Sequence, residues 1–101
     1  MGWASAAIEK LKQGQTVQVR PNGNSMSGHV ESGQLCTIEP VLSSSELKVG
    51  DIVLCRVEGR EYLHLIKAIS VGRFKIGNAR GNINGWVSGA NLFGRCTRVE
   101  P

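Results

Sequence analysis

Long hydrophobic runs are absent from this sequence, and so is a recognisable secretion signal. Because a helix that crosses a bilayer needs about 20 consecutive apolar residues, we expect no membrane span. The first residues, MGWASAAIEKLKQGQ, lack the cationic start of a secretory signal. Hydrophobic residues make up 41% and charged residues 20% of the chain, which is typical of a globular protein. We therefore expect a soluble, cytoplasmic protein.

Cysteine is scarce, and no segment matches a cofactor motif. The three cysteines, Cys36, Cys55 and Cys96, are odd in number and lack a Cys-x-x-Cys spacing, which argues against a zinc finger or a disulfide framework. We expect these cysteines to be buried free thiols. A metal site that combines them with His29 and His64 ranks last among the interpretations. We therefore expect neither a metal nor a cofactor.

The chain contains one helical segment followed by short β-branched runs. Residues 4–13, ASAAIEKLKQ, are rich in helix formers, and Trp3 is expected to anchor this helix. Short apolar runs separated by Gly, Asn and Ser predict strands at 15–20, 34–39, 51–58, 61–70, 73–77 and 92–100. We expect a single domain over 1–101, with a helix in 1–14 and a mainly β core over 15–101. The closely spaced turns favour a coiled, antiparallel, barrel-like sheet.

The predicted strand at 61–70 carries a lysine in an unusual place. Side chains alternate between the two faces of a strand, so Lys67 shares a face with Leu63 and Leu65. Lysines are rarely buried without a partner. Lys67 either extends to solvent from the rim of the sheet, or it is desolvated and acts as a general base. His64 falls on the opposite face, so we do not expect it to join Lys67 in a site.

The loop PNGNSMSGHVESGQL, residues 21–35, holds a candidate nucleophile. Ser25 follows a predicted strand and an Asn-Gly turn, so it is expected to project from a strand end. A serine hydroxyl needs a base, and neutral lysine fills that role in Ser–Lys variants of the catalytic triad. Backbone N–H groups around Ser25 could form an oxyanion hole. The alternative is a hydroxyl that makes a local turn hydrogen bond.

Taken in order, these elements resemble the signal-peptidase and LexA-like peptidase superfamily. The matching segments are GNSM, ESGQLCTIEP, LKVGDIVLCRV, EYLHLIKAI, RFKIGNARGN and NLFGRC, over roughly residues 15–99. The resemblance implies a coiled antiparallel β fold, with Ser25 as the nucleophile and Lys67 as the general base. It also assigns Gly23, Asn24 and Met26 to the loop that holds the nucleophile and its oxyanion hole, with Met26 packed beneath Ser25.

Some residues depart from the family pattern. Ser27 and Gly28 stand where the family has a proline turn after the nucleophile, which predicts a less rigid loop. Asn78 replaces the aspartate of a Gly-Asp-Asn-like turn, and in members that use histidine an aspartate orients the base. We also expect neither the membrane anchor of signal peptidases nor the helix-turn-helix of LexA-like repressors.

Three interpretations of function follow. The first is a Ser–Lys endopeptidase that cleaves a protein partner, or itself, at a small-residue site. The second is an inactive peptidase fold that binds a protein or peptide. The third is a small basic barrel that binds nucleic acid, for which the net charge of +4 is compatible but not sufficient. Its binding residues would be Arg73, Lys75, Arg80 and Arg95, interleaved with Phe74 and Trp86. The sequence does not predict an oligomeric state.

Overall fold

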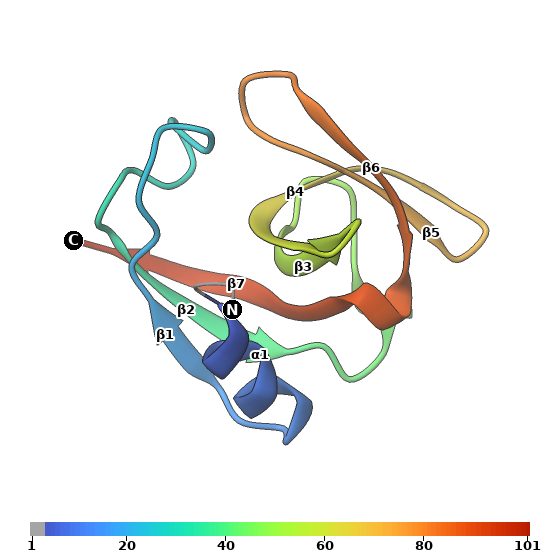
Figure 1. Ribbon diagram of the computed structural model, residues 1–101, viewed down its shortest axis with the longest axis horizontal. Helices are drawn as coiled ribbons and strands as arrows, with labels where there is room; N and C mark the ends of the chain where they lie inside the picture. Colours follow the sequence, from blue (N-terminus) through green and yellow to red (C-terminus); the bar gives the residue numbers. More distant parts are fainter. Residues whose placement is uncertain (1–3) are drawn as a thin grey trace.

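The structure is a computed structural model of the 101-residue chain, and it describes residues 4–101. Within residues 4–101, seven antiparallel strands form a single sheet that curls into a half-barrel, and one short α-helix packs against it (Figure 1). In chain order the elements are α1 (Ser5–Lys12), β1 (Val17–Val19), β2 (Leu35–Pro40), η1 (Ser44–Glu46), β3 (Ile52–Val57), β4 (Arg60–Ser70), β5 (Arg73–Gly77), β6 (Ile83–Ser88), η2 (Gly89–Asn91) and β7 (Leu92–Glu100). The prediction of a mainly β, antiparallel, barrel-like fold with one N-terminal helix is confirmed. Trp3, the expected anchor of the helix, lies outside the described residues.

The strands are ordered β1-β2-β7-β3-β4-β5-β6, so the C-terminal strand β7 lies between β2 and β3. α1 covers one end of this sheet, where it contacts β1, β2 and β7 (Figure 1). Its buried side chains, Ile8 and Leu11, lie on the stripe that the sequence predicted. Among residues 4–101, no helix is long and apolar enough to cross a membrane.

Two clusters of buried side chains fill the curl of the sheet, and β3 contributes to both. Leu54 belongs to the cluster that contacts α1, whereas Val53 and Cys55 belong to the other. Because both faces of β3 are covered, its sequence reads as an almost continuous apolar run. The first cluster also contains Met26, so the loop that carries Ser25 is seated directly on the core.

β4 is the longest strand and changes partners along its length. Over Arg60–Leu65 it pairs with β3, and over Leu65–Ser70 it pairs with β5. Residues 60–64 therefore have a strand on one side only. The other edge of this segment is open, and the loop between β1 and β2 lies beside it (Figure 1).

The sequence did not predict β6, whose residues are INGWVS. Asn84 and Gly85 are poor strand formers, so the local propensity is low. Pairing with β5 along the hairpin overrides that propensity. Gly85 has a φ of 145°, a value that glycine adopts without strain and other residues rarely adopt. The hairpin therefore depends on glycine at this position.

A strained residue in the β4–β5 turn offers a test of the backbone geometry. Val71 has a φ of 43° and its side chain is 98% exposed, so the strain is not offset by burial. Asn adopts the left-handed region more readily than a β-branched residue. Val71→Asn should raise the free energy of unfolding by about 1 kcal/mol, and Tm by roughly 4–8 °C. Val71→Ala, measured in the same urea and thermal titrations, should gain less; equal gains would contradict the strain argument.

Gly94 on β7 allows three elements to meet, which gives a second stability test. A Cβ at this position would lie 2.5 Å from Ile38 Cγ2 and 3.0 Å from Leu11 Cδ1. Gly94→Ala should therefore lower the free energy of unfolding by about 1–3 kcal/mol, the range for overpacked cores. Thr97→Ala, at an exposed position on the same strand, should change it by less than about 0.5 kcal/mol. A neutral Gly94→Ala in urea denaturation would rule out the close packing.

Candidate active site

The loop between β1 and β2 lies beside the open edge of β4 (Figure 1), and its Ser25 lines a cavity together with Leu63 and His64 of that strand. Hydrogen bonds fix this loop from within: the N–H of Gly23 donates to Ser32 Oγ at 3.1 Å, and the N–H of Gly28 donates to Glu31 Oε2 at 2.7 Å. Gly28 has a φ of 93°, which a proline cannot adopt. The turn after Ser25 is thus held by the side-chain contact of Glu31 and by backbone hydrogen bonds, such as that from the N–H of Val30 to the carbonyl oxygen of Met26 at 2.8 Å, without a proline.

Ser25, His64 and Asn84 form a continuous chain of side chains. Ser25 Oγ lies 3.3 Å from His64 Nε2, and His64 Nδ1 lies 2.7 Å from Asn84 Oδ1. Because the amide oxygen accepts a hydrogen bond, Nδ1 carries the proton and Nε2 can accept one from the Ser25 hydroxyl. The order of nucleophile, base and orienting group is that of Ser-His-Asp and Cys-His-Asn triads.

A β-bulge brings Asn84 to His64. Ile76 pairs with Gly85 and Gly77 pairs with Ile83, so Asn84 is an extra residue of β6 without a partner in β5. A bulge interrupts the alternation of side chains and can redirect one of them, and bulges are frequent next to active sites. The redirected amide reaches across β5, which separates β6 from β4 in the sheet.

Burial sets the protonation state of His64. The residue is 8% exposed, and desolvation lowers its pKa below the ordinary value of 6.5, while the hydrogen bond with Asn84 partly opposes this shift. The imidazole is therefore neutral at neutral pH, as a general base must be. Its contribution to stability is complete above pH 6.5 and is lost as the pH falls through the lower pKa of the folded state.

Lys67 is not part of this chain of side chains. Among residues 4–101, the side-chain partner of Ser25 Oγ is His64, and Lys67 does not line the cavity at Ser25. Lys67 is the extra residue of a bulge between β4 and β5, which removes it from the alternation that the sequence predicted. Its stem lies over Gly77, with Cγ 3.1 Å from an ideal Cβ at that position. The structure thus pairs Ser25 with His64, the histidine that the sequence placed outside the site, rather than with Lys67.

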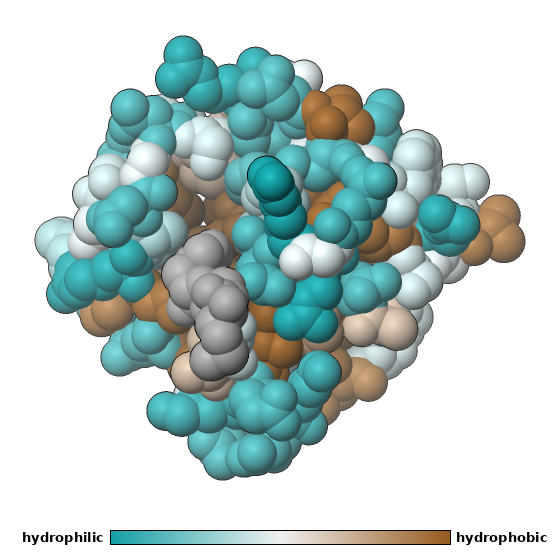
Figure 2. All heavy atoms as spheres, in the orientation of Figure 1, coloured by the Kyte–Doolittle hydropathy of each residue, from teal (hydrophilic) through white to brown (hydrophobic). Residues whose placement is uncertain are grey.

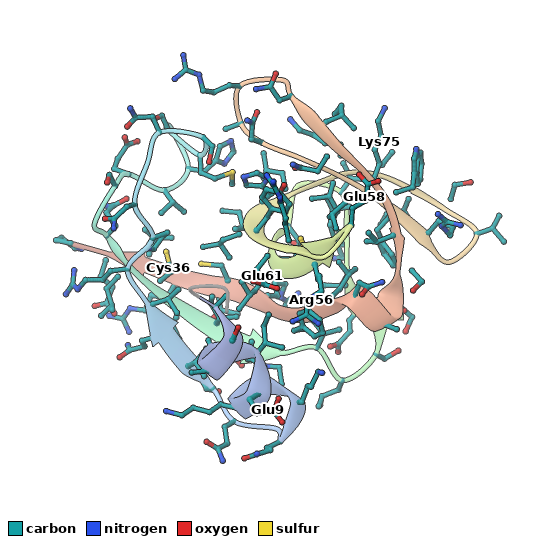
Figure 3. All side chains as sticks on the ribbon, viewed as in Figure 1. Glu9, Cys36, Arg56, Glu58, Glu61 and Lys75 are labelled. Carbon is teal, nitrogen blue, oxygen red and sulfur yellow. The ribbon has the colours of Figure 1, made fainter. Side chains whose placement is uncertain are left out.

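A cavity of about 490 Å³ opens beside Ser25 and His64. Its apolar lining includes Met26, Val30 and Leu63, and its charged lining residues are Arg20, Glu31 and Glu61. Figure 2 shows the surface hollowed between the loop and the curl of the sheet, with hydrophobic residues inside the hollow. Glu61 forms an ion pair with Arg56 on β3 at 2.9 Å (Figure 3). The cavity is large enough for one or two side chains of a peptide.

The backbone around Ser25 supplies unused donors. Within residues 4–101, neither the N–H of Ser25 nor that of Met26 donates a hydrogen bond to the protein. The carbonyl oxygen of Ser25 accepts from the N–H of Ala79 at 2.8 Å, which ties the loop to the β5–β6 hairpin. Met26 is buried in the core cluster. Free N–H groups beside a nucleophile are what an oxyanion hole requires.

Three other residues were selected from the sequence: Asn78, which lies in the β5–β6 loop, and Gly23 and Asn24, which precede Ser25. Asn78 is buried, and its Oδ1 accepts from the N–H groups of Arg80 and Asn82 at 2.9 and 3.0 Å. It therefore shapes the β5–β6 loop, whereas the amide that hydrogen-bonds with His64 is that of Asn84. Gly23 and Asn24 lie exposed in the loop before Ser25.

The residues of the nucleic-acid interpretation lie on more than one strand, and one of them is buried. Phe74 is 3% exposed and belongs to the core, so it is not available for stacking on a base. Trp86 is 43% exposed and lies opposite Lys75 on the neighbouring strand. Arg95, on β7, lies 4.0 Å from Asp51. The cysteines are free thiols: Cys36 and Cys55 are buried and Cys96 is partly exposed.

Sequence reasoning missed the roles of His64 and Asn84. Some members of the superfamily that the sequence resembles use histidine as the base, and the predicted strand at 61–70 holds His64 as well as Lys67; this was the available signal. Asn84 gives no comparable signal, because the sequence does not reveal the strand or the bulge on which it lies.

No family model matches this chain, and no curated protein matches it. The case for a function therefore rests on the geometry of the site.

Replacing the amide by a carboxylate tests the contact with His64. Asn84→Asp should raise the pKa of His64, because a negative charge beside Nδ1 stabilises the imidazolium. The pKa can be measured by following the imidazole signals in an NMR titration. Asn78→Asp is the matched control, because it adds the same charge at a side chain that hydrogen-bonds within its own loop rather than with His64. An unchanged titration in Asn84→Asp, or an equal shift in both variants, would contradict the geometry.

Proposed function

We propose that this protein is a serine hydrolase of the peptidase type, with Ser25 as the nucleophile, His64 as the general base and Asn84 as the orienting group. The observation that carries the proposal is the chain of hydrogen bonds from Ser25 through His64 to Asn84 at the edge of a cavity. A serine with only a local structural role would be satisfied by a neighbouring backbone group. The resemblance to the signal-peptidase and LexA-like superfamily supports a peptide substrate, with histidine in place of lysine.

The proposed reaction has two halves, acylation of Ser25 and hydrolysis of the acyl-enzyme, and each group acts once in each half. Ser25 Oγ attacks the substrate carbonyl carbon while its proton passes to His64 Nε2, and the N–H groups of Ser25 and Met26 stabilise the oxyanion. His64 then donates the proton to the leaving amine, and water hydrolyses the acyl-enzyme by the same route. The 3.3 Å separation of Ser25 and His64 is loose for a hydrogen bond, as is common before a substrate binds.

An extended peptide fits the open edge of β4. The N–H of Ile66 donates to the carbonyl oxygen of Asp51 on the β3 side. Backbone groups of successive residues in an antiparallel strand point to opposite edges, so those of Leu63, three residues before Ile66, point to the open edge. A substrate strand that pairs with Leu63 would pass Ser25 and place a side chain over the apolar lining of the cavity. This placement favours a peptide over a small ester.

A fluorophosphonate probe tests the proposal without a known substrate, because it forms a covalent bond to an activated serine with loss of fluoride. Mass spectrometry should show one adduct on the wild-type protein, located on Ser25, and none on Ser25→Ala. His64→Ala should slow labelling by roughly 10³-fold or more, since the base is lost. Lys67→Ala should label at nearly the wild-type rate, because Lys67 does not line the cavity.

Ser27→Ala is the matched control, since it removes an exposed hydroxyl two residues from the nucleophile. Normal labelling of His64→Ala together with loss of labelling in Lys67→Ala would favour a Ser–Lys dyad and overturn the assignment of the base. No adduct on the folded wild-type protein would overturn the hydrolase and leave the peptide-binding fold.

A further inference from the structure

Tyr62 contacts the face of the His64 ring. The two residues lie two positions apart on β4 and therefore share a face of the strand. Their ring centroids are 4.8 Å apart with an interplanar angle of 29°, a stacked arrangement. Tyr62 is half-buried and packs against the core cluster on that side of the sheet. It also lines the cavity beside Ser25. The ring thus touches the base without being part of the hydrogen-bonded chain.

An imidazolium at this site has little charge stabilisation from its hydrogen-bond partners. His64 becomes positive when it takes the proton of Ser25, and in most serine triads a carboxylate compensates that charge. Here the group at Nδ1 is the neutral amide of Asn84, and burial adds a desolvation cost for the cation. The face of an aromatic ring attracts a cation, and the attraction is larger in a desolvated site.

The charged groups around the cavity have other partners. Arg20 Nη1 donates to the carbonyl oxygen of Gly33 at 2.8 Å. Glu31 accepts from the N–H of Gly28, and Glu61 is paired with Arg56 on β3. The neighbour of His64 on β3 is Val53, which is uncharged. Within residues 4–101, the imidazole hydrogen-bonds with Ser25 and Asn84 and stacks on the ring of Tyr62.

We propose that Tyr62 is a positioning residue for the base: its ring fixes the plane of the His64 imidazole and stabilises the imidazolium that forms when Ser25 is deprotonated. In this role the aromatic face supplies part of the stabilisation that a carboxylate supplies in other triads. The interaction itself stands on the stacking geometry, and its consequence for catalysis rests on the proposed hydrolase function.

A graded series at position 62 tests this role. Tyr62→Phe keeps the ring and should leave the pKa of His64 close to that of the wild type. Tyr62→Leu removes the aromatic face and should lower that pKa, whereas Tyr62→Trp, which offers the strongest cation–π partner, should raise it. NMR titration of the imidazole measures the pKa directly and needs no enzymatic activity. Circular dichroism checks that each variant is folded. If Tyr62→Leu does not fold, the pKa of His64 in Tyr62→Trp, compared with that in Tyr62→Phe and the wild type, still tests the role.

The labelling rate of Ser25 by the fluorophosphonate probe is the second readout. Tyr62→Leu should slow it by about 3- to 10-fold, the effect of losing one cation–π contact, and Tyr62→Phe should restore it. A His64 pKa that does not follow the order Trp, Tyr, Leu would overturn the positioning role, whatever the labelling rate. If the pKa follows that order but the wild-type protein is not labelled, the stacking role stands and the hydrolase function fails.

Discussion

The hydrogen bond from His64 Nδ1 to Asn84 Oδ1 joins two strands that do not pair with each other. It fixes the tautomer of the imidazole, and the tautomer decides whether Nε2 can accept a proton from Ser25. The bond requires that β6 curl over β5 toward β4 and that a bulge release Asn84 from the ladder. The chemistry of the site therefore depends on the curvature of the sheet and on one extra residue in its edge strand.

An amide in place of a carboxylate changes the electrostatics of the base. Burial favours the neutral imidazole, so its Nε2 is unprotonated at neutral pH but its protonated form is poorly stabilised. A carboxylate at position 84 would reverse that balance and would also place an anion beside a buried ring. The stacked ring of Tyr62 is a milder solution, because it attracts the cation without adding a charge that must itself be solvated.

The sequence predicts the fold well because local signals and the overall pattern agree along most of the chain. The helix and six of the strands follow from helix propensity, apolar runs and Gly-rich turns, with boundaries within a few residues. Alternation also places Leu63 and Leu65 on one face and His64 on the other. It fails at Lys67 and at Asn84, because each is the extra residue of a bulge, and a bulge is decided by strand pairing rather than by local sequence. The contact between Asn84 and His64 was therefore beyond the reach of periodicity alone.

The β5–β6 hairpin provides Asn84, one end of the chain of side chains, and hydrogen-bonds with the backbone of Ser25, the other end. Its strand β6 carries Asn84, and its loop donates the N–H of Ala79 to the carbonyl oxygen of Ser25. The loop itself is shaped by the buried amide of Asn78 and by Gly77, where a Cβ would lie 2.6 Å from the carbonyl oxygen of Asn82. The hairpin therefore contacts the loop that carries Ser25 through Ala79 and contacts His64 on β4 through Asn84. Gly77 and Asn78, where the sequence departs from the Gly-Asp-Asn-like turn, thus shape the loop that contacts the backbone of Ser25.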